Sequence, residues 1–333
     1  MSKNTSPVWI VTLFIILLSP ALVAWGIYGH EHINKSAVFA LPETLQRFFY
    51  NHIDFVTQES TVPDLRKHTL NDKSEFPRHY INLEEYGPID SIPQTFPELK
   101  KKYNDAFLQE NGILPWYVEE MMDKLTLAMK EKHKTQILFI ASDLGHYLAD
   151  ASMPLHASTN HDGEKTNQKG IHSFWEAQLP DMYGNDYNYR VDDAVYITNI
   201  HEETWRIIKE SNRLVDSLLL PDQKLRTAFG ANSIYKLDAT GKIVRNKFNS
   251  PVHTEEYARQ YHTMLNGMIE RQMRKSISAT ANFWYTAWVN AGKPDLSDLD
   301  PADLTTQNAS RLRQEYDLWK KGKLTGINSE SEF

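Results

Sequence analysis

Cysteine is absent from the sequence. Disulfide bonds therefore contribute nothing to stability, and zinc sites built on thiolate ligands are excluded. Any zinc would be held by nitrogen and oxygen ligands, which is more usual for a catalytic site than for a structural one. The sequence also has no internal repeat, no heptad array, no glycine-rich phosphate loop and no clear Ser-His-Asp spacing.

Positive charge is not in excess. The 36 Lys and Arg residues are outnumbered by 43 Asp and Glu residues, and the formal net charge is −7. This balance argues against a broad basic face for duplex nucleic acid, although it leaves room for a local cationic pocket or for a metal cluster that binds phosphate. Whole-chain charge therefore separates few classes of function.

Long apolar runs are also missing, except for one at the N-terminus. Lys3, the apolar residues 8–18 and the small residues 19–24 together predict a signal peptide over residues 1–24. The apolar run is short for a membrane span, and an uncleaved anchor is the alternative. We expect the mature chain to begin at Trp25 and the protein to be secreted or periplasmic.

The rest of the composition is that of a globular protein. Of the 333 residues, 41% are hydrophobic and 24% are charged, which allows one large domain or two small ones. Most segments have the apolar spacing of helices, with a loop or short hairpin over residues 236–250. We expect a compact helical domain over residues 25–292. Residues 293–333 are polar and are interpreted as a peripheral tail with one short helical patch.

Histidine and carboxylate side chains gather around the most regular of the predicted helices. Residues 136–149 carry an apolar stripe at helical spacing, so that His146 and Asp150 lie one turn apart on one face. Pro154 should end or kink this helix, and His156 follows within reach of the other two side chains. Three ligand-type side chains are thereby expected at one helix end.

The same spacing occurs again after a polar loop, at His172 and Glu176. Three imidazoles and two carboxylates would then converge from two helices, and such nitrogen and oxygen ligands suit zinc. The alternatives are histidines that are hydrogen-bonded within the core, or a helix face exposed to solvent. Two His-carboxylate pairs on either side of a third histidine make both alternatives less favourable than metal binding.

The predicted mature N-terminus offers a further ligand set. The α-amine and the carbonyl of Trp25 would lie a few residues from His30, and an α-amine titrates near neutrality. The alternative is an ordinary first helix with a solvated His30. Asp64 and His79 both lie next to proline-stiffened backbone, and each is alternatively a turn residue or a surface polar group.

In their order along the chain, these residues resemble the ligand set of the zinc-dependent phospholipase C and single-strand-specific nuclease superfamily. The resemblance covers roughly residues 25–292 and implies an all-α fold with three zinc ions in a cleft. The nine matching positions are Trp25, His30, Asp64, His79, His146, Asp150, His156, His172 and Glu176.

The resemblance also implies how the ligands divide among three zinc ions. One ion would be held by Asp64, His79, His146 and Asp150. A second would be held by Trp25 and His30 with a shared carboxylate, either Asp64 or Asp150, and a third by His156, His172 and Glu176 with Asp150 or another carboxylate.

The implied activity is that of a zinc-dependent phosphodiesterase. Two zinc ions bridged by a carboxylate, Asp64 or Asp150, would activate water for attack on phosphorus, and the third would neutralise the developing charge. We expect Lys67, or else Arg66, to stabilise the transition state, although a surface cation is the alternative.

The substrate is less well defined. Phospholipase C-like hydrolysis of phospholipid headgroups is the first expectation, and a single-strand-specific endonuclease or 3′-nucleotidase is the alternative. A non-catalytic zinc-stabilised binding protein is a further one. Tyr80, Asn82 and Tyr28 are the candidate substrate-binding residues. The partner would be phospholipid or single-stranded nucleic acid, and we expect a monomer with no stable protein partner.

Overall fold

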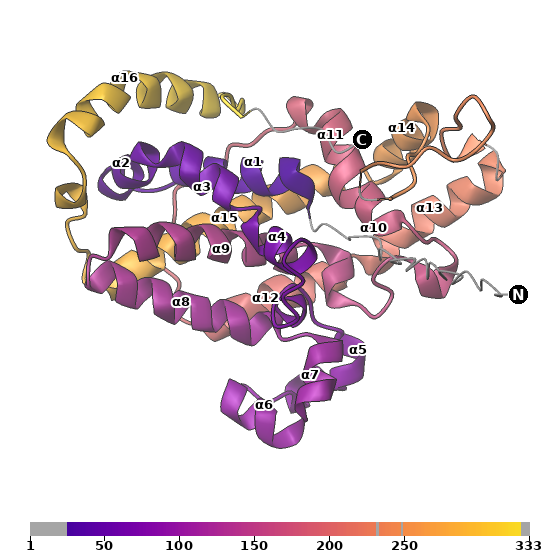
Figure 1. Ribbon diagram of the computed structural model, residues 1–333, viewed down its shortest axis with the longest axis horizontal. Helices are drawn as coiled ribbons and strands as arrows, with labels where there is room; N and C mark the ends of the chain where they lie inside the picture. Colours follow the sequence, from indigo (N-terminus) through magenta and orange to yellow (C-terminus); the bar gives the residue numbers. More distant parts are fainter. Residues whose placement is uncertain (1–24, 231–232, 248, 328–333) are drawn as a thin grey trace, which may run out of the picture.

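The computed structural model describes residues 25–230, 233–247 and 249–327, and nearly all regular structure within them is helical (Figure 1). The exceptions in this part are isolated β-bridges between residues 235 and 253, where a loop or short hairpin is predicted. The predicted all-α fold class, a single compact multi-helix domain, is thus confirmed. The predicted signal peptide lies outside the described residues. No described helix is both long and apolar enough to cross a bilayer.

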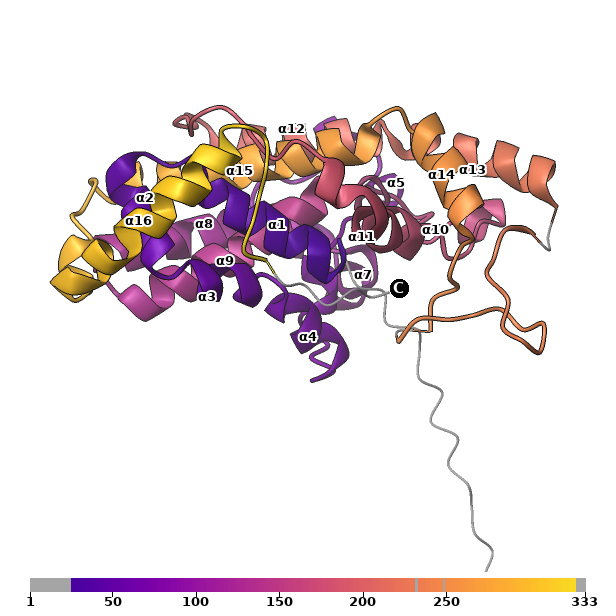
Figure 2. The ribbon, with the colours of Figure 1, turned by 90° about the horizontal axis from the view of Figure 1, so that it is seen from above.

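A bundle of long helices forms the body of the protein. These helices contact one another along their lengths, and in Figures 1 and 2 they run side by side across the molecule. The members are α1 (Gly26–Phe39), α8 (Leu114–Lys130), α9 (Lys134–Ala151), α12 (Ile200–Asn212) and α15 (Met268–Asn290). The predicted apolar stripe of α9 faces this bundle, and its residues Ile137, Leu144 and Leu148 are fully buried.

Shorter helices surround the bundle. α3 (Ile53–Glu59) lies against α1 and α9. The other short helices are α2 (Glu43–Asn51), α4 (Val62–His68), α5 (Leu83–Tyr86), α6 (Phe96–Lys102), α7 (Asp105–Asn111), α10 (Ile171–Ser173), α11 (Leu179–Tyr183), α13 (Val215–Phe229) and α14 (Glu255–Met264). Of these, α10, α11, α13 and α14 gather at one end, as Figure 1 shows on the right.

The C-terminal segment is more firmly attached than the prediction of a peripheral tail implied. It forms the helix α16 (Ala302–Trp319), which packs on α2 and crosses the top of the molecule in Figure 1. Trp319 is 2% exposed, and its Nε1 donates to Ser36 Oγ at 2.8 Å. Leu312 and Tyr316 precede it at helical spacing and contact the core. A polar segment with one apolar stripe therefore packs along that stripe.

Helices α1 and α9 approach each other closely at Gly145. A Cβ atom at this glycine would lie 2.0 Å from Oδ1 of Asn34 on α1. Asn34 is fully buried and donates from Nδ2 to Ser142 O on α9 at 3.1 Å, so it cannot move aside freely. The next residue along α9 is His146, whose ring stacks on His30 of α1 at a centroid distance of 3.9 Å. The glycine thus sets the separation of two candidate ligands.

We expect Gly145→Ala to reduce the free energy of unfolding by about 1–3 kcal/mol, because the added methyl group overpacks this crossing. Denaturant unfolding measures the effect. The matched control is Gln136→Ala on the exposed side of α9, which should change stability by less than about 0.5 kcal/mol. Equal stability of the two variants would show that the helices separate without cost.

Candidate metal centre

The nine residues that resemble zinc ligands come together in the interior. None of them is more than 4% exposed. They are contributed by the start of α1, by α4, by the turn that ends near residue 79, by the C-terminal half of α9 and by the segment that follows it. Five separate parts of the chain thus deliver polar side chains to one buried region.

Asp150 lies at the centre of this cluster. Its Oδ2 lies 2.9 Å from His79 Nδ1 and 3.3 Å from His146 Nε2. Its Oδ1 lies 3.7 Å from His30 Nε2 and 3.8 Å from His156 Nδ1. One fully buried carboxylate is therefore shared among four imidazoles from different parts of the chain.

Asp64 forms a second carboxylate beside the same imidazoles. Its oxygens lie 4.0 Å from His30 Nε2 and 3.7 Å from His79 Nδ1. Ligand atoms of His30, Asp64 and His146 lie within 4.8 Å of one another, as do those of His79, His146 and Asp150. Both carboxylates therefore reach His30, and the structure brings two overlapping groups of metal-ligand type together.

A third group lies at the end of α9. His156 Nε2 is 3.1 Å from His172 Nε2, and Glu176 Oε1 is 2.8 Å from that same nitrogen. Glu176 belongs to a π-helical turn, Phe174–Gln178, between α10 and α11. π-Helical turns inside helices are frequent at functional sites.

Trp25 closes the cluster on the side of α1. Its indole Nε1 donates to Ala149 O at 2.6 Å, and its ring packs on Trp175 at a centroid distance of 5.0 Å. Its main-chain amide is close enough to Glu176 to act on the pKa of that carboxyl. The structure thus places the main chain of Trp25 beside the predicted ligands.

Burial and charge pull the pKa values of these groups apart. Burial lowers the pKa of His30 to about 3 and that of His156 to about 3, so both imidazoles are neutral and able to bind a cation. Burial opposes the charge on Asp64, but Lys67 and the nearby imidazoles outweigh it and keep the pKa of Asp64 below its usual value. Burial raises the pKa of Glu176 to about 7.

The hydrogen bonds around His156 and His172 test whether a metal fits. The Nδ1 atom of His156 lies 2.5 Å from His79 O, and that of His172 lies 2.6 Å from His161 O. A carbonyl only accepts, so each Nδ1 carries the hydrogen and each neutral ring presents a lone pair at Nε2. These two lone pairs face each other at 3.1 Å. A cation between them removes the repulsion.

Buried polar atoms without hydrogen-bond partners also indicate a metal site. Within the described part of the chain, both ring nitrogens of His30 and Oδ1 of Asp150 are buried without a hydrogen-bond partner. Such groups cost free energy when they are left unpaired, and native proteins rarely leave several together. These buried histidine, aspartate and glutamate groups are able to bind metal ions, and the residues fit them.

A layer of charged residues supports the cluster from outside. Glu75 Oε1 lies 3.5 Å from His79 Nε2, and the same buried carboxylate accepts from Tyr147 Oη and from Arg66 Nε at 3.1 Å. A carboxylate behind a ligating histidine fixes its orientation and raises its basicity. Arg66 also pairs with Asp143 at 2.7 Å and is thus committed to this layer.

Lys67 is the cation that faces the cluster. Its Nζ donates to Asp64 Oδ1 at 3.2 Å, and the residue is 8% exposed. Of the two predicted candidates for stabilising the transition state, Lys67 lies beside a predicted ligand, whereas Arg66 points to Glu75 and Asp143.

The predicted substrate residues are placed differently. Tyr28 is 8% exposed, stacks on His32 at 3.7 Å and reaches Tyr189 Oη at 3.1 Å, and its role as a substrate contact stays a prediction. Asn82 is held by the α7 end, where its Nδ2 donates to Glu110 O at 3.3 Å. Tyr80 is half-buried, and its hydroxyl donates to the same carbonyl at 2.9 Å.

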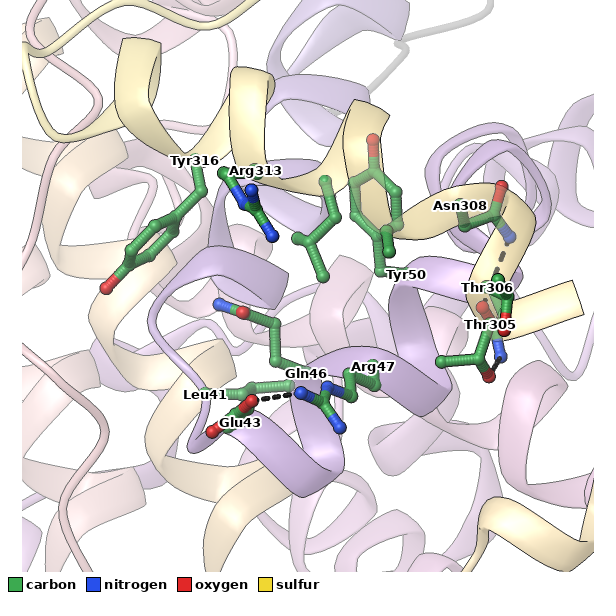
Figure 3. Close-up of a pocket in the computed structure, with 13 residues that line it drawn as sticks. Leu41, Glu43, Gln46, Arg47, Tyr50, Thr305, Thr306, Asn308, Arg313 and Tyr316 are labelled. Atoms are coloured by element: carbon green, nitrogen blue, oxygen red, sulfur yellow. Dashed lines mark hydrogen bonds and ion pairs between the residues drawn. The ribbon is translucent and has the colours of Figure 1, made fainter. Parts of the chain in front are cut away.

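Two cavities differ in their relation to the cluster. A cavity of about 580 Å³ lies between α2 and α16, where Figure 3 shows Arg47, Tyr50 and Arg313 facing a common space. None of the described residues that line it belongs to the cluster. A cavity of about 730 Å³ is lined by His161, Gly170 and Ser173 beside the third group and also by Tyr235, Ile243, Arg245, Asn249, Ser250 and Pro251. The second cavity is the one next to the candidate metal centre.

Two residues of the site were missed from the sequence. His161 lies in the polar loop, and its ligand atom is within 4.8 Å of those of His156 and His172. Its spacing of five residues from His156 was a usable signal. Glu75 lies four residues before His79, and this spacing, which also separates His146 from Asp150, was the usable signal.

Metal affinity should fall as the pH is lowered below about 7. The Glu176 carboxyl, whose pKa burial raises to about 7, takes up a proton there that must leave before an ion binds, whereas His30 and His156 stay neutral down to about pH 3. We expect about a tenfold loss of zinc affinity per pH unit, measured by competition with a chromophoric chelator. Affinity that is constant between about pH 5.5 and 7 would contradict this.

Comparison with known proteins gives little direct guidance. No protein-family model matches the chain. A protein of Bradyrhizobium tropiciagri named as a probable serine protease is 24% identical over 215 residues, which make up 62% of this chain and 27% of that protein. The chain thus spans only 27% of the length of this relative.

This comparison corrects the predicted function. The sequence predicts a zinc phosphodiesterase of phospholipase C or nuclease type, whereas the relative is named as a protease, which cleaves amide bonds. The prediction of phosphodiester hydrolysis does not fit that name and is withdrawn. The predicted and the named activities have hydrolysis in common.

Proposed function

We propose that the chain is a metal-dependent hydrolase. The observation that carries the proposal is the set of buried acceptor atoms that face one another across the cluster, above all His156 Nε2 and His172 Nε2 at 3.1 Å. Divalent ions would bind to these groups, up to three and most suitably zinc, and those beside Asp150 would polarise the substrate and lower the pKa of bound water. A resemblance to the phospholipase C and nuclease superfamily is retained here for the ligand set alone.

The side chains divide the remaining work. Asp150 touches four imidazoles and keeps them oriented toward a common centre, and Glu75 fixes His79 from behind. The ammonium group of Lys67 beside Asp64 supplies positive charge where negative charge builds up during hydrolysis. Because the cluster is buried, these interactions act in a poorly screened environment and are correspondingly strong.

The relative's name points to an enzyme and makes peptide bonds the first substrate to test. Its serine mechanism is not supported by Ser60 and Ser152, two buried serines beside candidate ligands. The Oγ atoms of Ser60 and Ser152 donate to the carbonyls of Thr57 and Leu148 at 2.6 and 2.9 Å. These hydroxyls are committed to the main chain, so the nucleophile we propose is water.

A substrate panel tests the proposal. The zinc-loaded chain is incubated with a protein substrate, a carboxylate ester and a phosphodiester, each with and without a chelator, and in parallel after treatment with a fluorophosphonate. We expect turnover that the chelator abolishes and the fluorophosphonate leaves intact. The reverse pattern would show serine chemistry. Turnover of the phosphodiester alone would reverse the correction made above, and no turnover in any arm would contradict the proposal.

Location and assembly follow as part of the same proposal. An apolar leader over residues 1–24 supports a secreted or periplasmic enzyme, and a chain without cysteine is compatible with that environment. We propose a monomer. Size-exclusion chromatography with light scattering would show a single species near 38.6 kDa for the full chain, or slightly less after removal of the leader.

A further inference from the structure

His161 lies beside the third ligand group but plays no part in the ligand set inferred from the sequence. Its ring centroid is 4.3 Å from that of His172 and 5.3 Å from that of His156. The ligand atoms of the three residues lie within 4.8 Å of one another. Three imidazoles from one turn, one loop and one short helix therefore share a small volume.

The main chain fixes all three rings in the same sense. His161 Nδ1 lies 3.2 Å from Leu155 O, as the Nδ1 atoms of His156 and His172 lie against His79 O and His161 O. Each Nδ1 must carry the hydrogen because each partner is a carbonyl. Nε2 of His161 is thereby left as a free lone pair, which is the tautomer that a metal-ligating histidine needs.

We propose that His161 is a fourth protein ligand of the ion at the His156, His172 and Glu176 group. Three imidazoles and one carboxylate make up a complete tetrahedral zinc shell, which is the arrangement of a closed site. This inference rests on the metal binding proposed above. The fourth ligand gives the ions different roles. Ions held by the groups around Asp150 keep open positions for water, whereas the ion at the His156, His172 and Glu176 group stabilises the fold.

The position of His161 gives the closed site a second consequence. The residue also lines the cavity of about 730 Å³, together with Asp162, Tyr235 and Arg245. Its ring is thus shared between the proposed ion and the cavity. A molecule bound in this cavity would therefore contact a ligand of the ion.

The test uses His161→Asn. The Asn amide keeps a donor for Leu155 O near the position of Nδ1 but has nothing at the position of Nε2, so that it removes the ligand and spares the loop contact. The matched control is His201→Ala, which removes a histidine on α12 whose Nδ1 pairs with Glu119 at 2.8 Å. Each protein is loaded with zinc, and the ions retained against increasing chelator are counted.

We expect His161→Asn to bind one ion about 10–100-fold more weakly than the unsubstituted chain and His201→Ala to bind all of them equally well. With cobalt in place of zinc, the visible absorption of tetrahedral sites should also fall in His161→Asn. Unchanged affinity and absorption in His161→Asn would overturn this inference and leave the proposed function standing. An unsubstituted chain that retains no ion would overturn both.

Discussion

Asp150→Asn is expected to lower metal-dependent turnover by about 10²–10³-fold or more and to reduce the number of bound ions. The carboxylate lies within 3.8 Å of four imidazoles, all of them candidate ligands. The amide of the variant has the shape of the carboxylate but no charge. One of its two oxygen positions becomes an NH₂ donor, which cannot bind a cation and does not match the imidazoles around it. Several ion positions would therefore be weakened together.

The control for this variant is Asp123→Asn, an exposed carboxylate on α8 that undergoes the same chemical change. It should keep full metal content and turnover. Metal content by elemental analysis is measured on the same samples as the rates, so that loss of an ion and loss of chemistry can be compared. An Asp150→Asn protein with the full number of ions and near-normal rates would show that the carboxylate is not central.

Removal of metal is expected to lower Tm by about 10 °C. An ion present at about 1,000 times its Kd stabilises the folded chain by roughly 4 kcal/mol, and each kcal/mol corresponds to about 2–4 °C in a protein of this size class. Without ions, the lone pairs of His156 and His172 face each other, and the ring nitrogens of His30 stay unpaired. With no disulfide to hold the chain, this loss is not offset elsewhere.

The measurement is thermal unfolding followed by circular dichroism, before and after chelation and after addition of zinc. Zinc should restore the original Tm, and magnesium, which prefers oxygen ligands, should not. A chain with the same Tm in all three states would show that the histidine cluster is stable by itself.

Local spacing accounts for the part of the site that the sequence revealed. His146 and Asp150 lie on one face of α9 because four residues make about one helical turn, and a proline after the helix returns His156 to the same region. The helical periodicity that defines α9 and α15 also defines the core. Such features depend on neighbours along the chain and can be inferred without the fold.

Features that depend on distant parts of the chain were not accessible in this way. The apolar stripe of α16 is short, and only its packing on distant residues, Ser36 and Phe39 among them, shows that Trp319 is buried. Tyr28 follows a predicted ligand region closely but turns toward Tyr189. The identity of the substrate could not be inferred from the sequence either, because it depends on how distant segments of the chain come together to line the cavity.

Elemental analysis of the purified chain tests the central claim most directly. The chain is dialysed against metal-free buffer at about pH 7.5, and the bound metal is counted beside that of Asp150→Asn. The account predicts more than one equivalent of a divalent transition metal, zinc above all, in the unsubstituted chain and fewer in the variant. A chain that retains no metal, and takes up none when zinc is supplied, would contradict the account.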